Sequence, residues 1–154
     1  FILGIVGGKN IFNQEKKMKR DKQCQNKMLF EVTVLTKEIK KMSQQAFLGI
    51  MLFENEGMKQ YQSLSNRFFD YIMAGIPQLC VAYPEYKKIN DQFQIAYMIG
   101  DIKIDSIENA LNAILSDDTG YETLKRNCMI ARVDLNWEKE EKKLEELYIQ
   151  FLKD

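Results

Sequence analysis

The sequence of 154 residues contains no histidine, and this absence removes several kinds of chemistry. Serine–histidine–aspartate and cysteine–histidine catalysis both need an imidazole base, so neither can operate within this chain. Metal sites built on histidine are excluded for the same reason. Only three cysteines occur, at positions 24, 80 and 128, and none forms a C-x-x-C pair. This spacing is typical of reduced thiols in a cytoplasmic protein, and of neither a disulfide framework nor a zinc site.

An excess of charge of either sign is also absent, since lysine plus arginine and aspartate plus glutamate both number 22. A non-specific nucleic-acid binder needs surplus cations to displace counterions from phosphate, so we expect no nucleic-acid partner. Lysine-rich stretches at 16–20 and 37–41 leave peripheral contact with an anionic membrane open. Solvated helix faces are the more ordinary interpretation of such stretches.

Long apolar runs are missing too. No stretch of about 20 apolar residues is present, so the sequence predicts no membrane-spanning helix. The first six residues, FILGIV, lack the basic leader and the small-residue cleavage site of a signal peptide. They contain no initiator methionine and have the composition of a strand. We therefore expect a fragment of a longer protein, in the cytoplasm or at the inner face of the membrane.

Short apolar segments alternate along the chain with longer amphipathic ones, which predicts a single α/β domain over residues 1–154. Strands that are apolar throughout are expected in a parallel sheet covered by helices on both faces. The predicted fold is therefore a Rossmann-like, doubly wound parallel sheet of about five to six strands, ending in a long C-terminal helix. The expected strands are 1–6, 27–32, 47–53, 78–82 and 95–97, and the expected helices are 12–25, 36–45, 63–74, 86–91, 107–115, 121–133 and 137–152.

The helix predicted over 63–74 carries the most chemical information. Residue types that open a helix stand at its start, namely Ser63, Ser65 and Asn66. In an α/β sheet this start faces the carboxyl edge of the strands, where ligands bind. Its unpaired N–H groups and the positive end of the helix dipole both favour phosphate. Arg67, in the first turn, adds a cation that can bind an anion with two hydrogen bonds.

Asp70 brings a carboxylate to the same helix. With Ser63 as the helix start, Asn66 and Asp70 share one face. About 7 Å of helical rise separates Asp70 from Ser65, which suits a diphosphate at the helix start and a ribose at the carboxylate. An amphipathic helix whose Asp70 is merely solvated fits the spacing equally well.

Residues 63–77, SLSNRFFDYIMAGIP, resemble the S-L-x-N-K-x-F-[DE]-Y-x-x-A-G-[IL]-P signature of GT-B-type retaining glycosyltransferases, the broad family-4-like group (glycosyl transferases group 1). The YPEY segment at 83–86 resembles the element that follows the next strand of that family. The NWE segment at 136–138 and the apolar stripe after it resemble the family's C-terminal helix. These three elements cover most of the chain beyond about residue 45, in the family's order and spacing.

The resemblance implies the C-terminal, donor-binding domain of a two-domain enzyme. Such an enzyme transfers a glycosyl group from a nucleoside-diphosphate sugar to an acceptor hydroxyl with retention, and the family needs no essential metal or other cofactor. The acceptor, a saccharide or lipid-linked saccharide of polysaccharide biosynthesis, would bind the missing N-terminal domain together with any catalytic base. We therefore assign no catalytic residue here, and expect this chain alone to bind donor weakly and to catalyse nothing.

By position, the resemblance assigns Asp70 to the ribose hydroxyls, and Ser65 and Asn66 to backbone contacts with the diphosphate. Arg67 matches a basic position of this subgroup, and Ser63 completes the predicted donor-binding set. The loop at Glu31, Val32 and Thr33 occupies the place where the family's backbone meets the nucleobase. An ordinary strand end is an equal interpretation of that loop.

Two departures from the family pattern stand out. Gln62 replaces a glutamate that contacts the transferred sugar in many members, and Glu54 or Glu56 in the preceding loop could substitute for it. The family's phosphate clamp belongs upstream of the chain, and residues 7–9, Gly-Gly-Lys, are better interpreted as an ordinary strand turn.

Other functions stay open beside this one. A GT-B-like sugar-nucleotide epimerase fragment would share the fold, but that group relies on a histidine. A non-catalytic interaction module of the flavodoxin or receiver type is another alternative, although the acidic cluster and the phosphoacceptor aspartate that receivers need are not found at residues 1–9 and 47–53. Gln62 favours a degenerate transferase domain. On the last helix, Trp137, Leu144, Leu147, Tyr148 and Phe151 form an apolar stripe, of which about half is expected to pack on the domain's own sheet.

Overall fold

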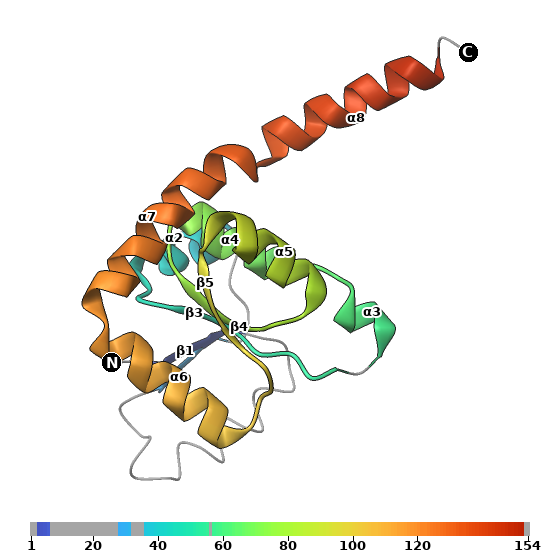
Figure 1. Cartoon of the computed structure of the whole chain (residues 1–154). Helices are drawn as coiled ribbons and strands as arrows, with labels where there is room; N and C mark the ends of the chain where they lie inside the picture. The colour runs from blue at the N-terminus through green and yellow to red at the C-terminus, as the bar shows by residue number, and fades with distance from the viewer. Residues whose placement is uncertain (1–2, 7–27, 32–35, 56, 153–154) are drawn as a thin grey trace. The chain divides into compact units, whose positions relative to one another are not determined.

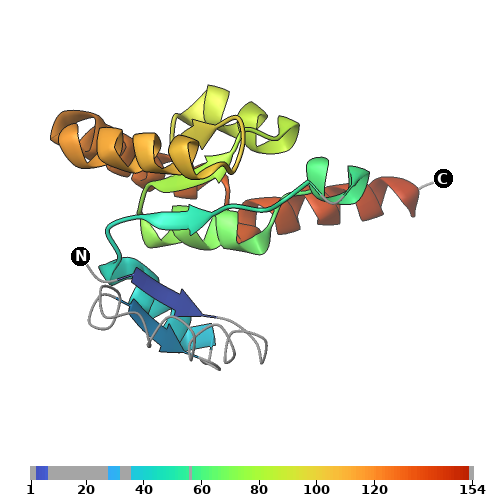
Figure 2. The same ribbon diagram turned by 90° about the horizontal axis from the view of Figure 1, so that it is seen from below.

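The computed structural model describes residues 3–6, 28–31, 36–55 and 57–152 (Figure 1). The chain divides into two compact units, Phe1–Lys41 and Met42–Asp154. In the first unit, β1 (Leu3–Val6) and β2 (Met28–Glu31) lie side by side as a parallel pair, with Leu3 opposite Met28 (Figure 2). The helix predicted over 12–25 lies outside the described residues.

Helix α2 (Thr36–Gln45) begins in the first unit and ends in the second, with the bounds that the sequence predicts. In the second unit a three-stranded parallel sheet has the order β3-β4-β5. Gln78 of β4 is the partner of Gly49 on one side and of Ala96 on the other. The strands are β3 (Gly49–Met51), β4 (Gln78–Val81) and β5 (Ala96–Ile99).

Beyond α2, the described residues form six helices: α3 (Met58–Tyr61), α4 (Asn66–Ala74), α5 (Pro84–Phe93), α6 (Ile104–Ser116), α7 (Asp118–Asp134) and α8 (Trp137–Phe151). Five of them correspond to predicted helices, and α3 is new. The predicted strand at 47–53 is shorter at both ends, and the strand predicted at 95–97 is displaced to 96–99. Proline at the first position of α5 starts that helix before the predicted residue 86.

Helices cover both faces of the three-stranded sheet, with α4 and α5 on one side and α6 on the other (Figure 1). The alternation of side chains along β4 explains this arrangement. Cys80 packs with Phe68 of α4 and Tyr86 of α5 in one buried cluster. Its neighbour Leu79 points to the other face and packs with Ile114 of α6.

The α/β class, the parallel strands and the long C-terminal helix are therefore confirmed. The described strands form one sheet of two and one of three, so the single larger sheet stays a prediction. No helix in the described part of the chain is both long and apolar enough to cross a membrane.

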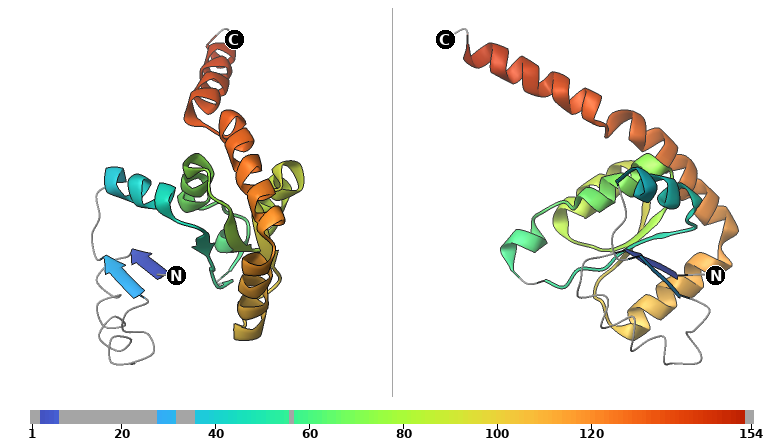
Figure 3. Two further views of the ribbon diagram at one scale, coloured as in Figure 1. Left: turned by 90° about the vertical axis from the view of Figure 1, so that its left-hand side faces the viewer. Right: turned by 180° about the vertical axis from the view of Figure 1, so that it is seen from behind.

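The expectation for the last helix is wrong. Figure 3 shows α7 and α8 as consecutive helices, and no residue of α8 is buried. Trp137 at its start is 67% exposed and Leu144 at its middle is 45% exposed. The apolar spacing along α8 is real, but neither half of the stripe packs on the sheet.

Candidate functional site

Helix α4 starts at Asn66, with Ser65 as its N-cap. The backbone of Ser65 is extended, and its hydroxyl oxygen accepts a hydrogen bond from the Arg67 N–H at 3.3 Å. Ser63 therefore lies outside the helix, which corrects the predicted start by three residues. Of the three residues of helix-opening type in the sequence, Ser63, Ser65 and Asn66, Ser65 has the geometry of the cap.

Gly75 ends α4 in the left-handed conformation, with φ of 75°. Between these two caps, Asn66 and Asp70 lie one helical turn apart on the same face, and both are exposed. Arg67 is exposed as well. The structure thus brings Ser65, Asn66, Arg67 and Asp70 together at the first two turns of one helix, as the sequence predicts.

The N–H group of Ser65 already has a partner, because it donates a hydrogen bond to the phenolic oxygen of Tyr86 at 2.9 Å. Tyr86 is buried, and its ring packs 4.9 Å from that of Phe68. Desolvation raises the pKa of Tyr86, partly offset by this hydrogen bond, so the phenol is neutral at physiological pH. A phosphate at the start of α4 would therefore use the N–H of Asn66 or displace the phenol.

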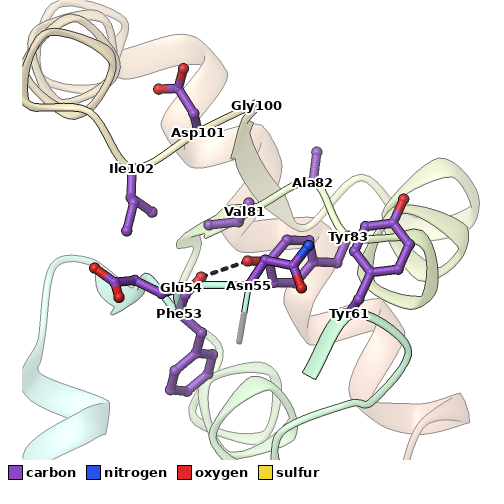
Figure 4. Close-up of a pocket in the computed structure, with 10 residues that line it drawn as sticks. All are labelled: Phe53, Glu54, Asn55, Tyr61, Val81, Ala82, Tyr83, Gly100, Asp101 and Ile102. Atoms are coloured by element: carbon purple, nitrogen blue, oxygen red, sulfur yellow. Dashed lines mark hydrogen bonds between the residues drawn. The ribbon is translucent and has the colours of Figure 1, made fainter. Parts of the chain in front are cut away.

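A cavity of about 450 Å³ lies at the carboxyl ends of β3, β4 and β5 (Figure 4). Its lining comes from the end of β4, from the segments that follow the three strands, and from α3. The lining residues are Phe53, Glu54, Asn55, Tyr61, Val81, Ala82, Tyr83, Gly100, Asp101 and Ile102. This is the edge at which open α/β sheets bind ligands.

Two tyrosines form one side of the cavity. The Tyr83 hydroxyl donates a hydrogen bond to the carbonyl oxygen of Phe53 at 2.7 Å, and this bond ties the loop after β4 to the loop after β3. The rings of Tyr61 and Tyr83 have centroids 5.5 Å apart and are tilted by 58°. Tyr83 is buried, whereas Tyr61 is 37% exposed.

The two carboxylates of the cavity differ in their surroundings. Asp101 accepts hydrogen bonds from the Ser106 hydroxyl at 2.6 Å and the Lys103 N–H at 3.1 Å, and it pairs with the Lys103 ammonium at 3.2 Å. These contacts, the Ser106 bond foremost, lower the pKa of Asp101. Its side chain points away from the tyrosine pair in Figure 4. Glu54 is exposed and has no ion-pair partner among the described residues.

The cavity and the start of α4 are adjoining, but they are lined by different residues. Tyr83 lies in the cavity wall, and its ring centroid is 6.5 Å from that of Tyr86, which holds Ser65. Of the predicted site residues, Glu54 lines the cavity, and none of the α4 residues does. Gln62 is the exposed C-cap residue of α3.

The remaining predicted residues belong to the other unit or lie outside the described residues. Glu31 is the last residue of β2, in the other unit. Val32, Thr33, Glu56 and residues 7–9 lie outside the described residues. Within the described ranges, no group of three or more cysteine, aspartate or glutamate residues could hold a metal ion.

Sequence reasoning missed Asn55, Tyr61, Tyr83 and Asp101 as candidate site residues. For Asn55, Tyr83 and Asp101 a usable signal existed, since each lies within four residues of the end of a predicted strand, and the carboxyl ends of these strands share one edge. Tyr61 gave no such signal, because it belongs to the short helix α3 within a predicted loop.

Comparison with known proteins gives no match, either to a protein-family model or to a curated protein sequence.

Proposed function

We propose that this chain is the donor-binding part of a GT-B-type retaining glycosyltransferase and binds a nucleoside-diphosphate sugar at the carboxyl edge of its parallel strands. The observation that supports this best is the arrangement of α4. It follows β3 and the short helix α3, begins at Asn66 directly after the cap residue Ser65, and carries exposed Asn66, Arg67 and Asp70 in its first two turns.

Each group has a role in this proposal. The start of α4 offers N–H groups and a positive dipole end to the diphosphate, and the Arg67 guanidinium adds a second source of positive charge. The Asp70 carboxylate, one turn further along the helix, accepts hydrogen bonds from both ribose hydroxyls. These groups would stabilise the negative charge that develops on the diphosphate as it leaves the transferred sugar, which is electrostatic catalysis by preorganised donors.

The parent enzyme in this proposal has a second domain, which binds the saccharide or lipid-linked acceptor and supplies any catalytic base. The donor domain itself would contain one doubly wound sheet of five to six strands. We propose that the enzyme acts in the cytoplasm, either free or at the inner face of the membrane. This chain alone would then bind donor and transfer nothing.

Calorimetric titration of UDP and GDP into the wild-type chain and into Asp70→Ala tests the proposal. We expect one nucleotide to bind, and the loss of the carboxylate to weaken it by about 1–3 kcal/mol, the usual worth of a charged hydrogen bond. Glu146→Ala on α8 removes one exposed carboxylate elsewhere and should leave the affinity unchanged. Equal affinities of Asp70→Ala and wild type would contradict the ribose role.

A second candidate function, a non-catalytic or degenerate module, is favoured by two observations. Tyr86 occupies the Ser65 N–H, and Gln62 stands in place of the family's sugar-contacting glutamate. This candidate predicts no binding of either nucleotide at millimolar concentration, both to this chain and to a longer chain that includes the upstream domain.

A further inference from the structure

The first turn of α4 has one backbone N–H group that is free to bind a ligand. The Arg67 N–H donates to the Ser65 hydroxyl oxygen at 3.3 Å, and the Phe68 N–H donates to the Ser65 carbonyl oxygen at 3.0 Å. The Asn66 N–H has no acceptor among the described residues. Because α4 begins at Asn66 and has nine residues, this N–H lies at the positive end of a helix dipole.

The phenol of Tyr86 is a second donor at the same place. Its oxygen accepts from the Ser65 N–H at 2.9 Å, but its own proton has no acceptor among the described residues. The side chain is 3% exposed and its ring packs against that of Phe68, so the hydroxyl group is held in position. Buried hydroxyl groups usually have an acceptor for their proton. Tyr86 thus offers a fixed O–H donor to a ligand at the start of α4.

The hydrogen bond from Ser65 makes this phenol a stronger donor. An O–H group whose oxygen already accepts a hydrogen bond is polarised, because consecutive hydrogen bonds strengthen one another. Burial raises the pKa of Tyr86, so the phenol keeps the proton that it donates. The strongest acceptor for such a proton is an ionised oxygen, such as that of a phosphate.

The charged groups nearby also favour an anion. Glu85, the neighbour of Tyr86 on α5, is paired with Lys88 at 2.5 Å. The Arg67 guanidinium is exposed and has no ion-pair partner among the described residues. Asp70, the acid of α4, lies about 6 Å of helical rise beyond Asn66, whereas Arg67 is the next residue. The closer charge on this helix is therefore the positive one.

We infer that Tyr86 is a further binding residue of the proposed diphosphate site, where its phenol O–H and the Asn66 N–H donate to phosphoryl oxygens of the ligand. The identity of this ligand as a nucleotide sugar rests on the proposed function. The Ser65–Tyr86 bond then belongs to the site and does not block it, because the phenol replaces the occupied Ser65 N–H with a donor of its own.

Calorimetric titration of inorganic pyrophosphate tests both donors without ribose, base or sugar. The variants are Tyr86→Phe and Asn66→Pro. Proline is favoured at the first position of a helix and removes the N–H, and the extended backbone of Ser65 is the conformation that precedes proline. We expect each variant to bind about tenfold more weakly than wild type, the usual effect of one hydrogen bond to a charged group. Tyr148→Phe and Asn66→Ala keep both donors and should bind as wild type does.

A direct measurement on the phenol separates binding by Tyr86 from support of the helix start, since loss of either would weaken pyrophosphate. With carbon-13 at the tyrosine ζ position, the signal that is missing from Tyr86→Phe belongs to Tyr86. Pyrophosphate should shift this signal with the midpoint found by calorimetry, because the ζ carbon carries the donating oxygen. The signal of Tyr148, which is exposed on α8, should stay unchanged.

Three results would overturn the inference. Pyrophosphate fails to bind wild type at tens of millimolar, or either Tyr86→Phe or Asn66→Pro binds it as tightly as wild type, or the Tyr86 signal stays fixed while pyrophosphate saturates the chain.

These outcomes are separable from those of the nucleotide titration, which depends on the Asp70 carboxylate. A nucleotide that binds through Asp70, with pyrophosphate binding that ignores Tyr86→Phe, would remove the phenol from the site and keep the donor proposal. Pyrophosphate binding with the expected response of Tyr86, and nucleotide binding that ignores Asp70→Ala, would keep the anion site and remove the donor proposal.

Discussion

The hydroxyl oxygen of Tyr86 accepts a hydrogen bond from the backbone N–H of Ser65 at 2.9 Å. This bond joins the first turn of α5 to the residue that caps α4, and so links the connections on either side of β4. Because Tyr86 is buried against Phe68, the bond holds the start of α4 against the core of the domain. The helix start that carries the proposed donor site is thus fixed by a side chain from the next helix.

Tyr86→Phe should destabilise the fold by about 1–3 kcal/mol, because it leaves the part-buried Ser65 N–H without its acceptor. The phenyl ring preserves the packing, so the loss reports the hydrogen bond and not a cavity. The free energy of unfolding from urea titration measures it. Tyr148→Phe removes an exposed hydroxyl on α8 and should leave the stability unchanged. If both variants match wild type, the bond contributes nothing to the stability of the domain.

Ser65→Ala should cost about 1 kcal/mol of stability, because it removes the oxygen that accepts from the Arg67 N–H at the start of α4. Ser63→Ala is the matched variant two residues upstream, and it should change the stability by less than about 0.5 kcal/mol, since Ser63 is exposed and precedes the cap. Urea unfolding of both variants decides between the two candidate helix starts. A larger cost at Ser63 would contradict the observed boundary.

The sequence allowed most of this site helix to be predicted, because its ends are marked by local chemistry. Capping serines precede it, and Gly75 and Pro77 follow it, so the helix and its exposed Asp70 could be expected without tertiary information. The sequence did not distinguish Ser63 from Ser65 as the N-cap of this helix. Both have a hydroxyl, and the difference is that Tyr86, from another helix, holds the backbone at Ser65.

The cavity could not be predicted in the same way. Its wall depends on Tyr61 meeting Tyr83, residues that come from different connections and whose contact is set by the packing of α3. For the apolar stripe of α8, the sequence predicted a packing contact with the sheet that the structure does not contain. A helical period of leucine and aromatic residues indicates that a face is apolar, but it does not identify the surface that covers that face.

Leu144→Gln combined with Phe151→Gln should change the free energy of unfolding by less than about 0.5 kcal/mol, because both side chains are already exposed on α8. Burial of the same stripe would instead make the double change cost several kcal/mol. Ile114→Ala in α6, which truncates a fully buried side chain, is the positive control and should cost about 2–5 kcal/mol. A loss at α8 comparable to that at Ile114 would contradict its exposed position.

Cys80 and Cys128 should resist thiol reagents in the native state at mildly alkaline pH. Burial raises the pKa of each thiol to about 12 from an ordinary value of 9.0, so the reactive thiolate is scarce and inaccessible. In a Cys24→Ser variant only these two thiols remain. Labelling with an aromatic disulfide reagent should be negligible without denaturant and should reach both thiols in urea. Rapid labelling of the native chain would contradict their burial.

The same pKa shifts make stability depend on pH in a defined direction. The native state holds the thiol protons more tightly than the unfolded chain does. The contribution of the two thiols to the free energy of unfolding is therefore fully present below about pH 9, and it is lost as the pH rises towards 12. Burial raises the pKa of Tyr71, Tyr97 and Tyr121 as well, which acts in the same direction. Urea unfolding at a series of pH values should therefore give a free energy that falls above about pH 9. A free energy that rises over this interval would mean that these groups ionise more readily in the folded chain than in the unfolded one.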